Sequence, residues 1–300
     1  MSAPIVINNP RDMREWTFQQ RCAGQTVGLV PTMGGLHEGH ASLMRESAGR
    51  DDASVLSVFV NPAQFAPHED FDQYPRTFDA DLALAERIGM DAVYAPTSST
   101  MYADDYSAYV KVEGLQEGLC GGSRPHFFRG VATVVTKLFN AVLPHRAYFG
   151  QKDAQQCAVI KRMVRDLDFG IEIVELPIVR DADGLALSSR NQYLSPEERQ
   201  RALSLPRALS LGLDLMQNGE REIHRIDSAV RDGLADLDID YIAIVDAVRI
   251  ERLVEAKGTV LLAAAAQVGA TRLIDNVKYT IPDAGDRNAS GLDSRYSLSV

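Results

Sequence analysis

Short apolar runs alternate with longer segments of helical periodicity through roughly the first 180 residues. The apolar runs have the length of buried strands and lie at 26–30, 54–60, 92–95, 147–149 and 171–176. The helical segments between them lie at 36–49, 78–88, 131–142 and 154–164. This alternation predicts an α/β fold with a Rossmann-like, doubly wound parallel sheet.

The pattern changes near Asp181. Asp183-Gly184 has the sequence of a hairpin turn, and Ser195 with Pro196 and Glu198 forms a strong helix start. The following segments predict helices near 196–218 and 223–236 and strands near 241–245, 260–264 and 272–277. We therefore expect a nucleotide-binding domain at 1–184 and a smaller α+β domain at 185–300, with a loose tail after Tyr279.

Composition narrows the function classes. The chain has 300 residues, 45% of them hydrophobic and 24% charged, which is ordinary for a globular protein. Its 31 basic and 41 acidic side chains give a net charge of −10, which disfavours nucleic-acid binding. Three scattered cysteines predict neither a disulfide framework nor a zinc site. The N-terminal segment does not resemble an export signal, and the longest apolar run is too short for a membrane span, so we expect a cytoplasmic protein.

The richest motif follows the first predicted strand and opens the first helix. It reads Pro31-Thr32-Met33-Gly34-Gly35-Leu36-His37-Glu38-Gly39-His40. The two glycines allow a nucleotide to approach the backbone, and free N–H groups at the helix start favour phosphate oxygens. His37 and His40, three residues apart, would project from one helix face towards the same anion. The alternative is a pair of solvated surface histidines; an ordinary P-loop sequence is absent from the chain.

Two further clusters place cations near the same predicted ligand. Gly150-Gln151-Lys152-Asp153 follows a short strand, so that Lys152 would neutralise phosphate charge and Asp153 would contact ribose hydroxyls. Gln156, one helical turn on, would hydrogen-bond a small polar substrate. Leu187-Ser188-Ser189-Arg190 suits a mobile clamp on a leaving pyrophosphate. Read alone, either cluster is also compatible with a solvated loop or turn.

Two loops complete the set of candidates. Asn61-Pro62-Ala63-Gln64-Phe65 closes the second strand, where an uncharged amide suits a carboxylate or hydroxyl substrate, although a plain surface turn has the same composition. Arg124-Pro125-His126-Phe127-Phe128-Arg129-Gly130 precedes the helix that contains Lys137. This second loop is either a cover over the substrate or an aromatic anchor under the helix.

In their order and spacing, these clusters resemble the pantothenate synthetase family of pantoate–β-alanine ligases, within the HxGH nucleotidylyltransferase superfamily. The resemblance extends from about Thr26 to Tyr279. It rests on VPTMGGLHEGH, FVNPAQF, DFDQYPRT, GVATVVTKLFN, YFGQKDAQQ, DGLALSSRNQYL and VGATRLIDN.

The resemblance implies an ATP-dependent enzyme, a homodimer with a C-terminal domain that closes over the nucleotide domain. Pantoate would attack ATP to give pantoyl adenylate and pyrophosphate, and β-alanine would then displace AMP to form a carbon–nitrogen bond, giving a coenzyme A precursor. Magnesium would be carried with ATP, and no metal site of the protein's own is expected.

The same resemblance assigns residues. His40 would be the catalytic acid, with His37, Lys152 and Arg190 acting on the phosphates, while Gln64, Gln156 and Asn61 would bind pantoate. The residues expected to contact ATP are Pro31, Met33, Gly34, Gly35, Leu36, His37, Glu38, Gly39, His40, Gly150, Gln151, Lys152, Asp153, Val179, Leu187, Ser188, Ser189 and Arg190.

Two positions depart from the family pattern. The family commonly reads R-P-G-H-F where this chain has Arg124-Pro125-His126-Phe127-Phe128, so His126 stands at the usual glycine and Phe127 at the usual histidine. Leu187 stands where methionine is frequent, a change of similar volume.

Three alternatives stay open from the sequence. One is another HxGH nucleotidylyltransferase acting on a phosphorylated acceptor, which pantoate-dependent ATP–pyrophosphate exchange would exclude. Another is a tRNA-binding module, disfavoured by the acidic balance. The third is an inactive relative with a structural role as a dimer, which would fail to bind ATP.

Overall fold

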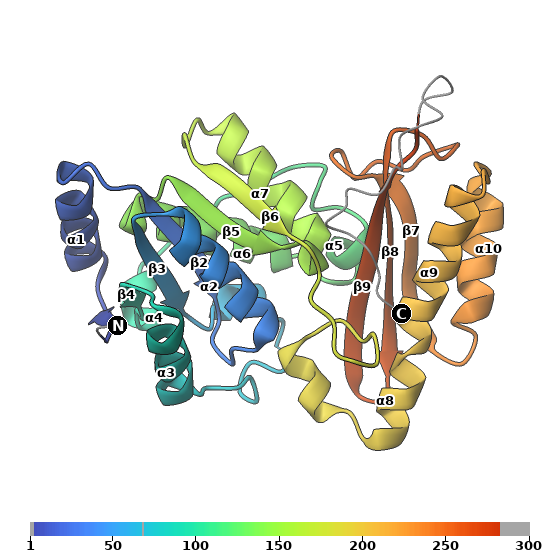
Figure 1. Ribbon diagram of the computed structural model, residues 1–300, viewed down its shortest axis with the longest axis horizontal. Helices are drawn as coiled ribbons and strands as arrows, with labels where there is room; N and C mark the ends of the chain where they lie inside the picture. Colours follow the sequence, from blue (N-terminus) through green and yellow to red (C-terminus); the bar gives the residue numbers. More distant parts are fainter. Residues whose placement is uncertain (1–2, 68, 283–300) are drawn as a thin grey trace. The chain divides into compact units, whose positions relative to one another are not determined.

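A computed structural model describes residues 3–67 and 69–282, and the chain divides into two compact units (Figure 1). The first unit holds the chain up to Gln116 together with Arg124–Gly150 and Val159–Leu176. The second holds Glu117–Ser123, Gln151–Ala158 and the chain from Pro177 onward. The predicted loose tail after Tyr279 lies mostly outside the described residues, although the last strand runs to Thr280.

The first unit is built on a parallel sheet, as the sequence predicted, but the sheet has six strands and not the five expected. Its strands are β1 (Ile5–Ile7), β2 (Val27–Thr32), β3 (Ala53–Val58), β4 (Ala92–Tyr94), β5 (Arg146–Gly150) and β6 (Glu172–Leu176). Their order in the sheet is β1-β4-β3-β2-β5-β6, with every neighbouring pair parallel. The strand order reverses between β2 and β5, and open α/β sheets bind ligands at such a point.

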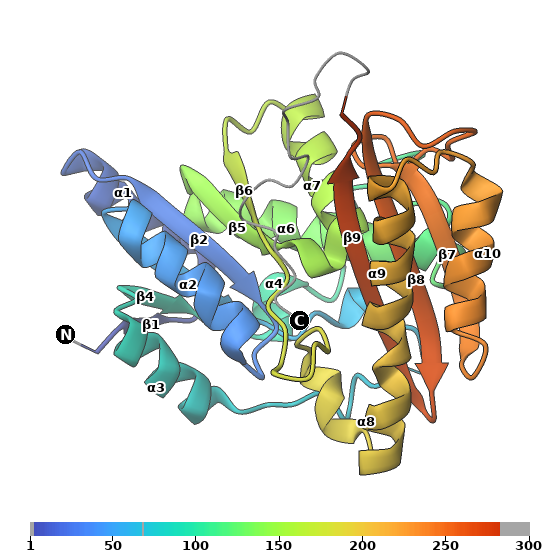
Figure 2. The same cartoon turned by 45° about the vertical axis from the view of Figure 1, so that its right-hand side comes forward.

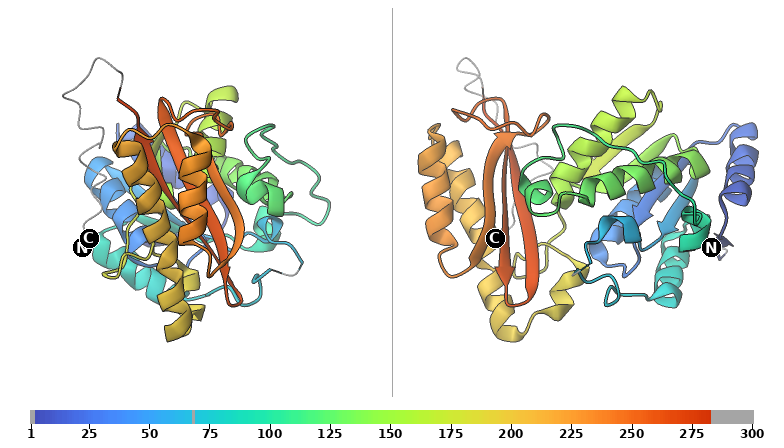
Figure 3. Two further views of the ribbon diagram at one scale, coloured as in Figure 1. Left: turned by 90° about the vertical axis from the view of Figure 1, so that its right-hand side faces the viewer. Right: turned by 180° about the vertical axis from the view of Figure 1, so that it is seen from behind.

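Helices cover both faces of this sheet, which explains the unbroken apolar runs of β2 and β3. Its helical elements include α1 (Pro10–Cys22), α2 (Glu38–Arg50), α3 (Phe78–Ile88), α4 (Ser98–Met101), α6 (Phe127–Val142) and the short turn η1 (Pro62–Gln64). The helices α2 and α3 pack together on one face (Figure 1), whereas α1 packs beside α6 on the other face, seen from behind in Figure 3. A cluster that includes Val30, Met44 and Leu56 fills the α2 side.

The sequence missed β1, which has only three residues, two of them exposed. Such a strand carries neither a long apolar run nor a clear alternation. Its place is fixed by pairing with β4, from Ile5 opposite Ala92 to Ile7 opposite Tyr94. Tertiary pairing therefore creates this edge strand.

The second unit has an antiparallel sheet of β7 (Asp238–Asp246), β8 (Thr259–Val268) and β9 (Thr271–Thr280). Its helices include α5 (Leu119–Ser123), α8 (Pro196–Ala202), α9 (Ser204–Gln217) and α10 (Ile223–Gly233), with short turns η2 (Gln151–Asp153) and η3 (Ser189–Tyr193). Figure 2 shows α9 running along the sheet, and Leu209, Ile226 and Leu262 belong to the core between helices and strands. The remaining helix, α7 (Ala154–Asp166), contributes residues to both units.

The predicted helix at 196–218 is wrong in one respect, because it consists of two helices that separate at Leu203. Pro206 lacks the N–H that a continuous helix would donate to Ala202, so the second helix starts afresh with Pro206 in its first turn. The Asp183-Gly184 turn is confirmed: the Asp181 N–H donates to the Leu185 carbonyl at 2.8 Å, and Arg180 pairs antiparallel with Ala186. Among the residues that the structure describes, no helix has both the length and the apolar character needed to cross a bilayer.

Candidate active site

His37 and His40 lie together where the chain passes from β2 into α2. His37 is the N-cap of α2 rather than part of the helix, with an extended backbone. Its Nδ1 accepts from the Gly39 N–H at 3.1 Å, and the Nδ1 of His40 accepts from the His37 N–H at 3.3 Å. This reciprocal cap brings the two ring centroids to 4.1 Å.

The cap also fixes the protonation pattern of both rings. A nitrogen that accepts an N–H carries no proton of its own, so in each ring the proton sits on Nε2. Each imidazole is therefore a neutral N–H donor through Nε2.

A buried carboxylate anchors the glycines that precede His37. Asp81 of α3 is 2% exposed, and its two oxygens accept the N–H groups of Gly35 at 3.1 Å and Leu36 at 2.9 Å. Gly34 and Gly35 have φ values of 83° and 61°, which glycine adopts without strain. A Cβ on Gly34 would also lie 2.9 Å from an Asp81 oxygen. The expectation of free backbone N–H groups is wrong for four residues of this loop, because Asp81 and the histidine cap accept the N–H groups of Gly35, Leu36, His37 and Gly39.

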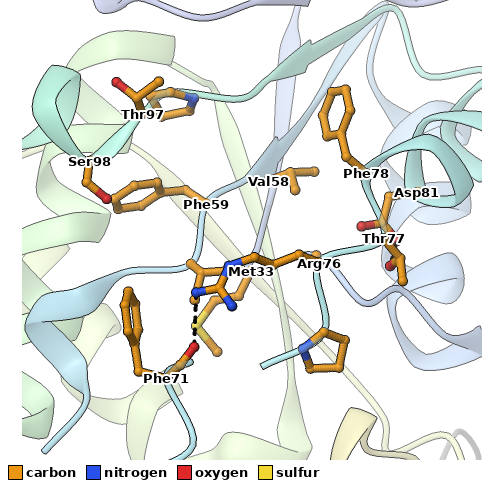
Figure 4. A pocket seen from close by; sticks show the side chains of 14 residues that line it. Met33, Val58, Phe59, Phe71, Arg76, Thr77, Phe78, Asp81, Thr97 and Ser98 are labelled. Atoms are coloured by element: carbon orange, nitrogen blue, oxygen red, sulfur yellow. Dashed lines mark hydrogen bonds between the residues drawn. The ribbon is translucent and has the colours of Figure 1, made fainter. Parts of the chain in front are cut away.

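Next to this loop lies a cavity of about 270 Å³ at the carboxyl end of β3 (Figure 4). Its walls are largely apolar and aromatic, with Met33, Phe59, Phe71 and Phe78 among them. The guanidinium of Arg76 lies 5.2 Å from the centre of the Phe71 ring and donates to the Phe71 carbonyl at 3.0 Å. The cavity therefore offers mainly an apolar surface beside Met33.

Asn61 and Gln64 approach the histidine loop through Met33. Both lie around the turn η1, directly after β3, and Asn61 is 1% exposed. The Asn61 Nδ2 donates to the Gln64 Oε1 at 3.0 Å, and the Gln64 Nε2 donates to the Met33 Sδ at 3.2 Å. The structure thus groups two predicted substrate-binding residues with Met33 of the histidine motif.

The atypical loop at 124–130 is held down by its arginine. The Arg124 guanidinium forms a two-pronged ion pair with Glu69, at 2.5 and 2.6 Å, and stacks 3.8 Å from the centre of the Phe127 ring. His126 has φ −100° and ψ −8°, a conformation open to any residue, so replacing the usual glycine costs no backbone strain. Phe128, the second residue of α6, is 2% exposed, so of the two interpretations of this loop its burial favours the aromatic anchor.

In the second unit, the Gln151–Asp153 turn is fastened to β9. Asn276 is 3% exposed, and its Nδ2 donates to the carbonyls of Gln151 and Lys152, each at 3.0 Å. The Gln151 Nε2 donates in return to the Asn276 Oδ1 at 3.2 Å. Asn276 thereby fixes the backbone from which Lys152 extends.

The hairpin in the same unit presents the other predicted ATP contacts. The Leu187 N–H donates to the Val179 carbonyl at 3.0 Å, which sets these two residues opposite each other. Ser188 is the N-cap of η3, and its hydroxyl accepts the Arg190 N–H at 3.3 Å. The Arg180 guanidinium pairs with the buried Asp275 at 2.7 and 3.0 Å, which ties the hairpin to β9.

The remaining predicted positions have varied surroundings. Pro31 lies within β2, Gly150 ends β5, and Gln156 is half-buried on α7, one residue after the buried Gln155. Glu38 is exposed and pairs with Arg45 at 2.6 Å; that hydrogen bond lowers the pKa of the Glu38 carboxyl.

Sequence reasoning missed Asp81 and Asn276. Asp81 had a usable signal, because it lies four residues before Ala85 and seven before Ile88, on a face of α3 that is otherwise apolar. An acidic residue at such a position needs a buried partner. Asn276 belongs to the string VGATRLIDN, but no role could be assigned to it from the sequence. Its hydrogen-bond partners lie more than 120 positions away in the chain, so they leave no local sequence pattern.

The fold and this loop define a class: a doubly wound α/β protein whose H-x-G-H sequence caps the helix after its central strand. A family profile described as pantoate-beta-alanine ligase matches residues 5–278. The chain therefore belongs to the pantoate–β-alanine ligase family.

Individual relatives agree with this placement. The chain is 53% identical over 275 residues to a pantothenate synthetase of Acetivibrio thermocellus, covering 91% of this chain and 98% of the relative. It is 56% identical over 274 residues to one from Moorella thermoacetica, with 90% and 97% covered.

Solved structures of the family have the same fold. Pantothenate synthetase from Thermus thermophilus matches with a TM-score of 0.86 at 40% identity, over 91% of this chain and 98% of that one. Pantoate-beta-alanine ligase from Francisella tularensis, complexed with beta-gamma ATP and beta-alanine, matches with a TM-score of 0.74 at 28% identity, over 92% and 97%.

Proposed function

We propose that this chain is an ATP-dependent ligase that condenses pantoate with β-alanine to form pantothenate, releasing AMP and pyrophosphate. The observation that carries the proposal is the capped pair His37 and His40 at the carboxyl end of β2, where the strand order of the sheet reverses. Family membership and the nucleotide and β-alanine bound by the Francisella protein support the same substrates.

The reaction has two balanced steps. In the first, a pantoate carboxylate oxygen attacks the α-phosphorus of ATP, the bond to the bridging oxygen breaks, and pyrophosphate leaves with both electrons of that bond. In the second, the β-alanine amine attacks the acyl carbon of pantoyl adenylate, AMP leaves, and the nitrogen loses a proton. Neutral Nε2–H donors on His37 and His40 suit this chemistry, because they stabilise charge that grows on phosphate oxygens.

The second unit supplies the remaining proposed contacts. Lys152 and Arg190 would neutralise the phosphates, with Lys152 held on the turn that Asn276 fastens. Gln151, Asp153, Val179 and the segment from Leu187 to Ser189 would contact ATP, and Gln156 would join Gln64 at pantoate. Their support is the family pattern and their positions directly after β5 or in the hairpin.

Magnesium is proposed to enter only with ATP. No group of three His, Cys, Asp or Glu side chains within 3–67 and 69–282 is arranged to hold a metal ion. Asp81, which lies beside the histidine loop, is already bound to two backbone N–H groups. The proposed steps therefore use Asp81 as a backbone anchor and not as a metal ligand.

We also propose a homodimer in the cytoplasm, where ATP is abundant. Sedimentation equilibrium would test the first part, with a mass twice the 32.9 kDa of the chain expected. A monomer at micromolar concentration would contradict the dimer without affecting the proposed reaction.

Pyrophosphate release gives the most direct test of the reaction. With ATP and pantoate alone, we expect a burst of about one pyrophosphate per active site, because the adenylate forms and stays bound. Adding β-alanine should give continuous turnover with stoichiometric AMP. Pyrophosphate release that needs a phosphorylated acceptor in place of pantoate would instead favour the rival nucleotidylyltransferase.

A further inference from the structure

Two backbone groups and the Tyr102 hydroxyl together hold the Asn61 side chain. Its Oδ1 accepts the Ala63 N–H at 3.3 Å, and its Nδ2 donates to the Gly130 carbonyl at 3.2 Å. A backbone N–H can only donate and a carbonyl can only accept, so the amide of Asn61 has one favourable orientation. Gly130 allows this close approach, because a Cβ there would lie 2.2 Å from the Ala63 oxygen.

The orientation of the Asn61 amide determines the orientation of the Gln64 amide. The Nδ2 of Asn61 is a donor, so the atom of Gln64 that faces it at 3.0 Å must be the acceptor Oε1. The Nε2 of Gln64 then points to Met33, whose thioether is only a weak acceptor. A carboxylate or hydroxyl oxygen would be a stronger acceptor for the same N–H.

Tyr102 completes the chain of hydrogen bonds. It follows α4, and its hydroxyl donates to the Asn61 Oδ1 at 2.7 Å. Burial raises the pKa of Tyr102 well above its ordinary value, so the phenol keeps its proton and stays a donor. Its ring packs edge-on against Tyr106 at 4.9 Å, and the Lys137 ammonium lies 5.8 Å from its centre.

We propose that Tyr102 is a positioning residue for the small hydroxy-acid substrate: acting through Asn61, it holds the Gln64 amide with its N–H donor directed at a substrate oxygen. This inference rests on the proposed function of Gln64 in pantoate binding. It predicts that the protein prefers substrates with a hydrogen-bond acceptor facing the Gln64 Nε2, such as a carboxylate or hydroxyl oxygen. Tyr102 itself touches no reacting atom.

Tyr102→Phe tests the proposal, because it removes one hydroxyl and leaves the Ala63 N–H on Asn61. We expect the KM for pantoate to rise about fivefold to tenfold, the size of one hydrogen bond, with the KM for ATP unchanged and the melting temperature lowered by no more than about 4 °C. Tyr106→Phe is the matched control: it removes a hydroxyl from the neighbouring ring and should leave all three quantities at their wild-type values.

Gln64→Ala separates this inference from the proposed function. If Gln64→Ala raises the pantoate KM and the double variant with Tyr102→Phe is no worse than Gln64→Ala alone, Tyr102 acts through Gln64 as proposed. If Gln64→Ala raises it but Tyr102→Phe does not, the positioning role is refuted and the proposed function stands. Equal rises in the KM values for pantoate and ATP in Tyr102→Phe would also refute it, because they indicate a general structural role. An unchanged pantoate KM in Gln64→Ala refutes the role of Gln64 and with it this inference.

Discussion

The chemistry proposed for the two histidines depends on which nitrogen each ring presents. Both Nδ1 atoms accept backbone N–H groups, so the N–H donor of each ring is Nε2. Two imidazolium rings with centroids 4.1 Å apart would repel each other, whereas two neutral rings do not. The pair can therefore supply two donors to one phosphate without the cost of holding two charges together.

His40→Ala should reduce the rate of pantoyl-adenylate formation in the burst by at least about a hundredfold. This is the usual effect of removing a donor that stabilises transition-state charge. Rapid-quench measurement of pyrophosphate with ATP and pantoate gives this rate. His224→Ala is the control, because that histidine lies exposed on α10, where it pairs with Glu222 at 3.4 Å. A near-normal burst in His40→Ala would contradict the catalytic role.

Side chains with proposed direct roles stand in clearer sequence patterns than the side chains that hold them. The histidines, Gln64 and Lys152 stand in short motifs after strands, where residue type and position suggest chemistry. Tyr102 reaches Asn61 across 41 positions of the chain, so its role depends on a contact that no local pattern encodes.

The loop between β2 and α2 takes its shape from a neighbouring helix as well as from its own glycines. The first turn of α3 brings Asp81 under Gly35 and Leu36, and Thr77 at the start of α3 donates its hydroxyl to the same carboxylate at 3.2 Å. The packing of α3 on α2 therefore supports the geometry of the histidine cap.

Asp81→Asn tests this support. One amide NH₂ would then face a backbone N–H, which should lower the free energy of unfolding by about 1–3 kcal/mol. Because the loop would also lose an anchor, we expect adenylate formation to fall by more than about tenfold. Denaturant unfolding and the pyrophosphate burst measure the two effects. Asp79→Asn, at an exposed position on the same helix, should change neither. A destabilised variant with a normal burst would show that the histidines do not need the anchor.

The stability of the first sheet has a component that depends on pH. His145 precedes β5 and bonds to the start of β2, where its Nδ1 accepts the Val27 N–H at 2.9 Å and its backbone N–H donates to the Val27 carbonyl at 2.7 Å. Burial, followed by the charge of Arg21, lowers the pKa of His145 below its ordinary value. Because the folded protein binds this proton less readily than the unfolded chain, stability is full above the unfolded pKa and declines as pH falls towards the folded one.

We therefore expect the wild-type melting temperature to drop between about pH 7.5 and pH 5 through this group, with His145→Asn showing a smaller drop. The asparagine Oδ1 can accept the Val27 N–H without taking up a proton. Thermal unfolding followed by circular dichroism across this range measures the difference, and His224→Asn controls for the loss of an exposed histidine. Parallel pH profiles for wild type and His145→Asn would contradict the assignment.

The alternation of apolar runs and helical segments determined the parallel sheet. The sequence by itself also determined the change of hydrophobic pattern near residue 181 and the motifs that follow β2, β3 and β5. These features follow from local periodicity and turn chemistry, which a linear sequence carries directly. Tertiary structure decided the pairing of β1, the reciprocal cap of the histidine pair, and the anchoring of the motifs by Asp81, Tyr102 and Asn276. Each of these depends on a hydrogen bond between residues distant in the chain or on a cap geometry that exists only once the backbone has folded.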